Sequence, residues 1–218
     1  MSNRLYIGSR RYSSWSMRGW LAVRLAGLDV EETVIRLTGG DTPAIKRLSP
    51  GGTVPVLLHE GNLIWDSLAI VEYCAEIAPH LWPADRAARA VARAVSAEMH
   101  SSYRDLRLAM PMCLGCSHPG QGRTPGALAN IARIEQLWAD ARAHFGGQFL
   151  FGDFGAADAM FAPVVARFAI YRPALSLATE AYCASVRAHP LVAQWIADAA
   201  AEPADWREDR YEAFTPTP

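Results

Sequence analysis

Lysine is almost absent from this chain of 218 residues, since Lys46 is the only one among 21 basic residues. Any anion that the protein binds must therefore be met mainly by arginine, by backbone N–H groups or by helix N-termini. The 22 acidic residues leave a formal net charge of −1. No overall electrostatic attraction toward nucleic acid or an acidic membrane surface is expected.

Cysteine is also scarce: the chain has four, without the paired spacing of a disulfide framework. We therefore expect reduced thiols. The run Cys113-Leu-Gly-Cys116-Ser-His118 superficially resembles a redox or metal cluster. It has no fourth ligand at a zinc spacing and lies in a helical region, so neither a metal site nor a disulfide is expected there. Cys74 falls on the apolar face of a predicted helix, which favours core packing.

Long apolar runs are missing as well. The most apolar stretch, residues 156–171, is interrupted by Asp158 and Arg167, which argues against a membrane span. The first residues lack the apolar centre of a secretion signal, and no Asn-x-Ser/Thr acceptor occurs. These absences favour a cytoplasmic protein. The sequence also lacks Gly-x-Ser-x-Gly, the phosphate-binding loop and Gly-x-Gly-x-x-Gly, so hydrolase and nucleotide-dependent functions lose their main support.

The residues that are present indicate a folded globular chain, with 51% hydrophobic and 20% charged residues. In the first 80 residues, apolar periods of 2 and 3.6 alternate as an α/β unit requires. The first two strands are expected to be parallel because a helix connects them, and Glu60-Gly61 predicts a tight hairpin. The predicted strands are 5–7, 30–37, 54–59 and 62–65, and the predicted helices are 14–26, 43–48 and 67–78.

After residue 83 the composition changes to Ala, Leu and Arg at helical spacing. The predicted fold is therefore an α/β domain over residues 1–81 followed by an all-α bundle over residues 86–218. A loop is expected over residues 113–125, and the aromatic tail 206–212 is expected to fold back over the bundle or a pocket. The predicted helices of the second half are 84–108, 126–144, 156–171, 178–187 and 190–200.

The turn after the first strand carries Ser13, Ser14 and Trp15 at the start of a helix. A helix N-terminus favours an anion, and a serine hydroxyl there can donate a hydrogen bond to a thiolate. Ser13 is equally interpretable as a simple N-cap. A thiolate site at this turn therefore needs support from other motifs.

Two further motifs supply such support. Thr53-Val54-Pro55 precedes the third strand, where a proline can hold a cis bond that turns backbone groups toward a ligand. Asp66 and Ser67 open the following helix, where they can receive a carboxylate and an ammonium group, although capping alone also explains them.

Together, these motifs resemble the glutathione transferase superfamily, whose N-terminal domain is thioredoxin-like. The Ser-Ser-x-Ser-x-Arg turn, the Val-Pro pair and the Asp-Ser-Leu-Ala-Ile helix start stand in the family's order, and Asp158 fits its helix-capping signature. The turn is most similar to the serine-type zeta class, in which the first serine activates glutathione. That resemblance implies Ser13 as the activating residue, with Ser14 as the neighbouring candidate.

The same resemblance implies the rest of the site. Trp15, Thr53, Val54 and Pro55 would contact glutathione, and Asp66 with Ser67 would hold its γ-glutamyl end. A small hydrophobic electrophile would bind between the serine turn and the second domain, with Cys113 and Arg167 as wall candidates. The family implies a homodimer that uses glutathione as co-substrate and no metal. A glutathione-dependent isomerase of the maleylacetoacetate type and a non-catalytic binding or regulatory member remain as alternatives.

Several positions depart from the zeta pattern, among them Gly155, which replaces the capping Ser/Thr three residues before Asp158. The Lys-Gln pair before Val-Pro is replaced by Gly52 and Thr53, and Lys46 is not expected to replace that lysine locally. The zeta-class arginine of the helix near Asp158 aligns with Ile170. We hypothesise that Arg167, one turn earlier, takes over anion binding; the alternative is a partly buried arginine paired with a carboxylate.

Overall fold

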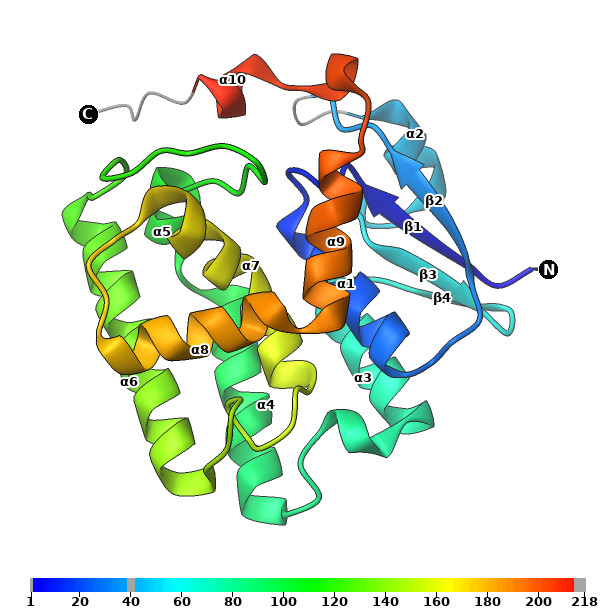
Figure 1. Cartoon of the computed structure of the whole chain (residues 1–218). Coiled ribbons are helices and arrows are strands. Elements are labelled where there is room, and N and C mark those ends of the chain that lie inside the picture. Colours follow the sequence, from blue (N-terminus) through cyan, green and yellow to red (C-terminus); the bar gives the residue numbers. More distant parts are fainter. Residues whose placement is uncertain (1, 39–41, 214–218) are drawn as a thin grey trace.

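The computed structural model describes residues 2–38 and 42–213, and its four strands form one mixed sheet beside a group of helices (Figure 1). The sheet order is β2-β1-β3-β4. β1 pairs with β2 in parallel, and with β3 antiparallel. β3 and β4 form the predicted hairpin, in which Glu60 and Gly61 both have positive φ. The strands are β1 Arg4–Gly8, β2 Glu31–Ile35, β3 Val56–His59 and β4 Asn62–Ile64.

Two helices pack side by side between the sheet and the helical half of the chain (Figure 1). These are α1 Ser14–Leu25 and α3 Ser67–Ile77, while the short α2 Pro43–Leu48 follows β2. α1 ends at the predicted stop, where Gly27 has a φ of 67° that most residues with a side chain avoid. The order of strands and helices up to residue 77 is as predicted, and it gives a thioredoxin-like arrangement.

The rest of the chain is helical, apart from two isolated bridges at Gly147, Phe149 and Gly152. α7 lies at its centre and contacts both α1 and α4. All but one residue of α7 are buried, which explains why its sequence is apolar on every side. The elements are η1 Pro79–Leu81, α4 Arg86–Ser101, α5 Arg104–Ala109, α6 Pro125–Phe145, α7 Ala156–Tyr171, α8 Leu177–Ala188, α9 Pro190–Ala200, η2 Ala204–Trp206 and α10 Asp209–Glu212.

One helix prediction was wrong in its extent. Residues 84–108, expected as a single helix, form α4 and α5 with a break before Arg104. Tyr103 adopts a left-handed conformation with a φ of 62° and donates its hydroxyl to Glu98 at 2.6 Å. The break changes the direction of the chain, so that α5 brings Arg107 to the serine-bearing turn. Among the described residues, no helix is both long and apolar enough to span a bilayer.

Candidate active site

The turn between β1 and α1 is fixed by buried serines. The carbonyl of Ser9 accepts the N–H groups of Tyr12 and Ser13, at 3.2 and 2.9 Å. The Ser16 hydroxyl oxygen accepts the Gly8 N–H at 3.0 Å. Because both serines have no exposed surface, these hydrogen bonds are shielded from water and hold the start of α1 in one position.

Ser13 and Ser14 lie at that helix start with different partners. Ser13 is the N-cap of α1: its Oγ accepts the Ser16 N–H at 3.3 Å and donates to Ser16 Oγ at 2.7 Å. Ser14 Oγ accepts from Arg167 Nη2 at 3.3 Å, which leaves the Ser14 hydroxyl proton available to a ligand. The capping interpretation of Ser13 is therefore confirmed, and Ser14 carries the hydroxyl proton that is not already donated.

Both serines open onto a cavity of about 340 Å³, here called the serine cavity. Its walls come from the β1–α1 turn, from α2 and the loop before β3, from α5 and the loop after it, and from α7. The predicted C-terminal tail closes one side with Arg210 and Tyr211. The complete lining is Tyr12, Ser13, Ser14, Trp15, Leu37, Thr42, Ile45, Gly52, Thr53, Val54, Arg107, Pro111, Met112, Arg167, Arg210 and Tyr211.

A second cavity of about 300 Å³, the Asp66 cavity, shares Trp15, Thr53 and Val54 with the first. Its lining consists of the six residues predicted to contact glutathione, with His100 of α4 added: Trp15, Thr53, Val54, Pro55, Asp66, Ser67 and His100. The Val54–Pro55 bond is cis, as the sequence suggested. The tertiary structure thus brings together three motifs that are more than 50 residues apart at their ends.

The polar groups of the Asp66 cavity come from the N-terminus of α3 and from α4. Asp66 caps α3, since its Oδ1 accepts from Leu68 N at 2.9 Å, and its Oδ2 lies 3.1 Å from His100 Nε2. The Ser67 hydroxyl is buried and has no hydrogen-bond partner among the described residues. A buried hydroxyl without a partner is costly, so Ser67 has a donor and an acceptor to offer a ligand.

Two arginines pack against Trp15, and a third, Arg167, contacts the neighbouring Ser14. The guanidinium carbons of Arg18 and Arg107 lie 4.6 and 4.5 Å from the Trp15 ring centroid. Arg167 is held by the carbonyls of Met110 and Pro163, at 2.8 and 3.1 Å. Stacking on the indole ring holds the two flanking guanidinium groups in place.

Within the described residues the cluster has no ion-paired carboxylate, although the Asp66 carboxylate interacts electrostatically with Arg18. Arg18 is fully buried and Arg167 is 4% exposed. Burial lowers the pKa of Arg18, and it lowers that of Arg167 to about 9, with repulsion from Arg107 acting in the same direction. No carboxylate among residues 2–38 and 42–213 forms an ion pair with any of the three, so Arg167 does not have the carboxylate partner that was the alternative. An anionic ligand would supply the missing charge.

Tyr12 also faces the serine cavity, but its hydroxyl is engaged. It donates to Glu212 at 2.7 Å and accepts the Glu208 N–H at 2.9 Å. Burial raises the pKa of Tyr12 to about 12. The Tyr12 hydroxyl proton is therefore already donated and is not available to a thiolate.

The comparisons with known proteins agree with this geometry. Residues 12–77 match the family model of the glutathione S-transferase N-terminal domain, and residues 121–214 match that of the C-terminal domain. The chain belongs to the glutathione S-transferase superfamily. A curated relative, the probable maleylacetoacetate isomerase of Caenorhabditis elegans, is 31% identical over 155 residues, which are 68% of this chain and 61% of the relative. Two further relatives are matched over 40% and 50% of their lengths, so the chain spans less than two thirds of these curated proteins.

Solved structures extend the match to almost the whole chain. A glutathione transferase homologue from Burkholderia gl BGR1, with bound glutathione, gives a TM-score of 0.69 at 24% identity and covers 92% of this chain and 100% of that one. The theta-class enzyme of Xanthomonas axonopodis pv. citri, also with glutathione, gives 0.63 at 28% identity and covers 90% and 98%. The superfamily's thioredoxin-like and helical parts are therefore both present.

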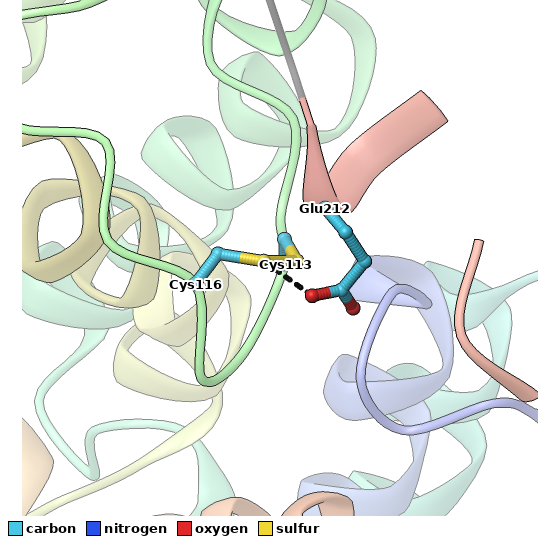
Figure 2. Close-up of side chains that lie close together, drawn as sticks. All are labelled: Cys113, Cys116 and Glu212. Atoms are coloured by element: carbon cyan, nitrogen blue, oxygen red, sulfur yellow. Dashed lines mark hydrogen bonds between the residues drawn. A yellow bond between two sulfur atoms is a disulfide. The ribbon is translucent and has the colours of Figure 1, made fainter. Parts of the chain in front are cut away.

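One predicted wall residue of this superfamily member lies behind the pocket surface. Cys113 has no exposed surface and is outside the lining, whereas its neighbours Pro111 and Met112 are part of it. The expectation of reduced thiols is wrong for this residue, because Cys113 and Cys116 form a disulfide with their Cα atoms 5.5 Å apart (Figure 2). Gly115, with a φ of 88°, allows the turn that brings them together. Cys74 and Cys183 are free and buried.

The sequence argument about Lys46 is also revised. Gly52 lines the serine cavity, and the Lys46 Cγ lies 3.8 Å from the point where a Gly52 Cβ would stand. The single lysine of this superfamily member is therefore adjacent to the position where the zeta pattern has Lys-Gln. The sequence did not predict that Lys46 lies beside Gly52, six residues later. This proximity arises because α2 and the loop that follows it fold back on each other.

Sequence reasoning missed three residues of the site. His100 and Arg107 come from α4 and α5, where a charged residue at helical spacing is indistinguishable from a solvated one. Arg18 was seen only as a family motif residue, although its full burial is the stronger signal. The tail prediction did find Arg210 and Tyr211, because exposed aromatic side chains are costly.

Proposed function

We propose that this protein is a glutathione transferase that activates the glutathione thiol for attack on a small electrophile. The observation behind the proposal is the pair of adjoining cavities: six predicted glutathione contacts line one, while Ser13, Ser14, Arg107 and Arg167 line the other. Bound glutathione in two structural relatives supports the same co-substrate. In the proposed reaction glutathione is the co-substrate and no metal ion takes part.

Glutathione would lie along the loop before β3. The backbone of Val54 would pair with the peptide-like tripeptide as a neighbouring strand does. Ser67 would donate to its γ-glutamyl carboxylate, and Asp66 would accept from its ammonium group. The glycyl carboxylate would approach Gly52 and Thr53, where Lys46 supplies a positive charge. The thiol would then point across Trp15 into the serine cavity.

The Ser14 hydroxyl would stabilise the thiolate at this point. Its oxygen accepts from Arg167, so its proton is free to be donated to sulfur, and the cationic guanidinium adds electrostatic stabilisation. The N-terminus of α1 adds a further favourable field. Ser13, predicted from the family pattern, would then act mainly by fixing the helix start, with a direct role if its hydroxyl rotates away from Ser16.

The electrophile would carry an anionic group. Leu37 and Met112 offer apolar contact in the serine cavity, whereas Arg107, Arg167 and Arg210 offer positive charge. This distribution also favours the alternative function, a glutathione-dependent isomerase acting on an unsaturated carboxylate. Three curated relatives bear the name maleylacetoacetate isomerase, one of them with the qualifier probable. In that reaction the thiolate adds to the substrate and leaves again after rotation about the relevant bond, so the same residues would serve it.

Calorimetric titration with glutathione, combined with an ultraviolet pH titration of the bound thiol, tests the proposal. Wild-type protein should bind glutathione and lower its thiol pKa. Ser14→Ala should retain binding while the thiol pKa returns toward about 8.5, the value of an unperturbed cysteine thiol. Ser13→Ala should lower protein stability by about 1 kcal/mol through loss of the N-cap, with a smaller effect on the thiol. Lys46→Gln should weaken the binding of glutathione without changing the pKa of the bound thiol.

The alternatives give different results in the same experiment. Loss of the thiolate in Ser13→Ala but not in Ser14→Ala would assign activation to Ser13. Absence of glutathione binding by the wild type would favour the non-catalytic module. Turnover of a cis-unsaturated dicarbonyl acid without consumption of glutathione would assign the isomerase reaction.

We further propose a cytoplasmic homodimer. Apolar side chains are exposed on β4, α3 and α4 at Leu63, Ile77 and Val91, which favours a subunit contact. The net charge of −1 and the lack of an Asn-x-Ser/Thr acceptor in the given residues are compatible with that location. Light scattering would test the first part, since a monomeric mass at micromolar concentration contradicts it. Fractionation of the source cells would test the second.

A further inference from the structure

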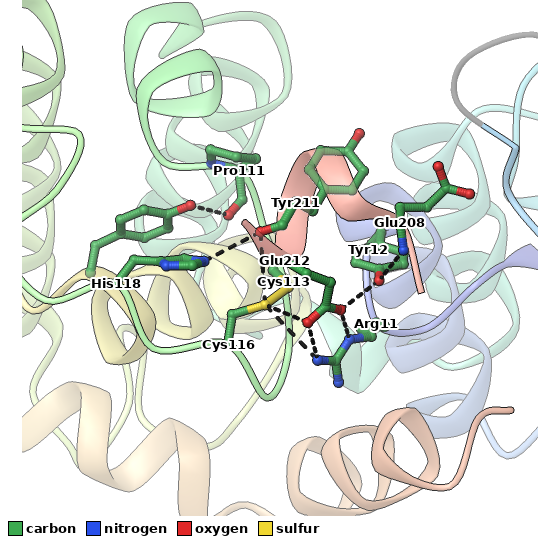
Figure 3. The surroundings of a disulfide bond; sticks show 10 residues. Arg11, Tyr12, Pro111, Cys113, Cys116, His118, Glu208, Tyr211 and Glu212 are labelled. Carbon is green, nitrogen blue, oxygen red and sulfur yellow. Dashed lines mark hydrogen bonds and ion pairs between the residues drawn. A yellow bond between two sulfur atoms is a disulfide. The ribbon is translucent and has the colours of Figure 1, made fainter. Parts of the chain in front are cut away.

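The disulfide of Cys113 and Cys116 lies between the wall of the serine cavity and the C-terminal segment 208–212 (Figure 3). On one side, Cys113 follows the wall residues Pro111 and Met112 directly. On the other side, Cys116 Sγ lies 3.5 Å from Glu212 Oε2 (Figure 2). Arg210 and Tyr211, which close the cavity, directly precede Glu212. A change in the disulfide therefore acts on two parts of the cavity at once.

The C-terminal segment is held mainly by the turn before Ser13. Arg11 donates to Glu212 through Nε at 2.6 Å and through Nη2 at 2.9 Å, and the Tyr12 hydroxyl donates to the same carboxylate at 2.7 Å. The Tyr211 ring stacks on Tyr12 with centroids 5.0 Å apart. Because Arg11 and Tyr12 both donate to Glu212, displacement of its carboxylate would weaken the hold on the segment.

The loop closed by the disulfide, residues 113–116, packs tightly against the same turn. Leu114 N donates to Arg11 O at 2.9 Å, and a Cβ on Gly115 would stand 2.6 Å from Arg11 Nη1. Arg11 Nη2 also lies 3.9 Å from Cys116 Sγ. Cys113 is fully buried, whereas Cys116 is half-buried. When the sulfur–sulfur bond is broken, the two sulfurs must separate to van der Waals distance, and the movement falls on Cys116, next to Glu212.

We propose that Cys113 and Cys116 form a redox-active pair that exchanges with glutathione and controls how firmly segment 208–212 covers the serine cavity. The oxidised pair keeps the segment closed. The reduced pair pushes Cys116 against Glu212, weakens its bonds to Arg11 and Tyr12, and loosens the segment. The effect on electrophile binding rests on the proposed function, whereas the redox exchange and the loosening do not.

The exchange balances with glutathione as reductant. A glutathione thiolate attacks Cys116 Sγ, the more accessible sulfur; the Cys116–Cys113 bond breaks, and Cys113 leaves as a thiolate that takes up a proton. A second glutathione thiolate attacks the glutathione sulfur of the mixed disulfide and releases Cys116 as a thiol. Two glutathione molecules are oxidised to glutathione disulfide, and the protein gains two electrons and two protons. Glu212 repels the incoming thiolate, so the closed segment protects the disulfide.

The redox part is tested on the full-length protein by equilibration in glutathione buffers, acid quenching, alkylation and mass spectrometry. The fraction of the Cys113–Cys116 disulfide should vary with the ratio of glutathione to glutathione disulfide, while Cys183, buried and unpaired, stays a thiol at every ratio. Glu212→Gln should accelerate reduction. A pair that is entirely disulfide, or entirely dithiol, at all ratios would overturn the proposal. Retention of one zinc ion by the reduced protein would also overturn it.

The coupling part is tested by hydrogen exchange of the backbone amides of residues 208–213. Reduction should raise their exchange rate several-fold, and Cys116→Ser should show the same fast exchange with or without reductant. Cys183→Ser is the matched control and should keep the wild-type response. Equal exchange in oxidised and reduced wild type would contradict the coupling even if the pair exchanges with glutathione. Because exchange is read without substrate, this result is independent of any transferase activity.

Discussion

At the scale of single residues, two groups of this site are present without the partner that would balance them. Ser67 has a buried hydroxyl with no hydrogen-bond partner in the described part of the chain. Arg167 is a buried cation whose hydrogen bonds, within the described residues, go to carbonyls and the Ser14 hydroxyl. Because such groups cost stability without a partner, they support the positions proposed for the carboxylate and the thiolate of glutathione. Sequence proximity to a helix N-terminus gave much weaker support for the same site.

Arg167→Gln is expected to discriminate between anionic and neutral electrophiles. Loss of a hydrogen bond to a charged group is worth about 1.5–3 kcal/mol, so kcat/KM for an anionic electrophile should fall roughly ten- to a hundredfold. A neutral aryl halide should lose less, since it uses Arg167 only through Ser14. Steady-state kinetics with both substrates would check this.

Arg123→Gln is the matched control, because Arg123 is exposed and away from both cavities. It makes the same change in charge and should leave both rates unaltered. An equal loss for the two electrophiles in Arg167→Gln would argue for a structural role, through Met110 and Pro163, over an anion-binding one.

At the scale of secondary structure elements, the start of α7 depends on a buried carboxylate. Asp158 accepts from Leu150 N and Gly155 N, each at 3.1 Å, and from the Tyr182 hydroxyl at 2.9 Å. Gly155, the N-cap, offers no side-chain acceptor of its own, so Asp158 reaches back to its N–H group. Despite these donors, burial raises the pKa of Asp158 to about 6.

This shift predicts a pH dependence of stability. The folded carboxyl holds its proton more tightly than the unfolded one, which releases it near 3.8. The free energy of unfolding should therefore fall as the pH rises from about 4 to 6, by on the order of 3 kcal/mol from this group, and then level off. Urea unfolding of wild type and Asp158→Asn between pH 4.5 and 7.5 would check it, since the variant lacks this slope.

The exposed Asp153 provides the control, because Asp153→Asn should keep the wild-type slope. If wild type instead gains stability relative to Asp158→Asn as the pH rises, the hydrogen bonds to the carboxylate outweigh its desolvation, contrary to the prediction. Either result identifies which of the two effects governs the start of α7.

At the scale of the whole molecule, the sheet-bearing half is completed by the helical half. Arg18 of α1 donates to the Met160 carbonyl of α7 at 2.9 Å and is fully buried. Trp20 of α1 packs against Trp195 of α9, with ring centroids 5.5 Å apart. Without the helical half, the Arg18 and Trp20 side chains would be exposed to water. Both cavities would also lose one wall.

A fragment of residues 1–82 is therefore expected not to fold cooperatively. Thermal unfolding followed by circular dichroism should show a broad change for the fragment and one sharp transition for the full chain. Mixing the fragment with residues 83–218 should restore a cooperative transition. A sharp transition in the fragment alone would show that α1 does not need α7 and α9.

Local pattern predicted the elements well for a physical reason. Strand alternation, helical periodicity and stop signals such as Gly27 act within a few residues, so the order of strands and helices up to residue 77 followed from the sequence. The one wrong helix boundary, at Tyr103, involves a left-handed residue stabilised by Glu98. The sequence patterns used to assign helices do not predict such a contact.

The sequence by itself determined the serine-bearing turn, the Val54-Pro55 pair and the Asp66-Ser67 helix start, and with them the glutathione transferase resemblance. Only the tertiary structure decided which serine proton is free, that Lys46 lies beside Gly52, and that Cys113 pairs with Cys116. It also brought Arg18 and Arg107 to Trp15, and Arg167 to Ser14. The reason is that hydrogen bonding, charge balance and disulfide pairing depend on distances between side chains, which chain order does not specify.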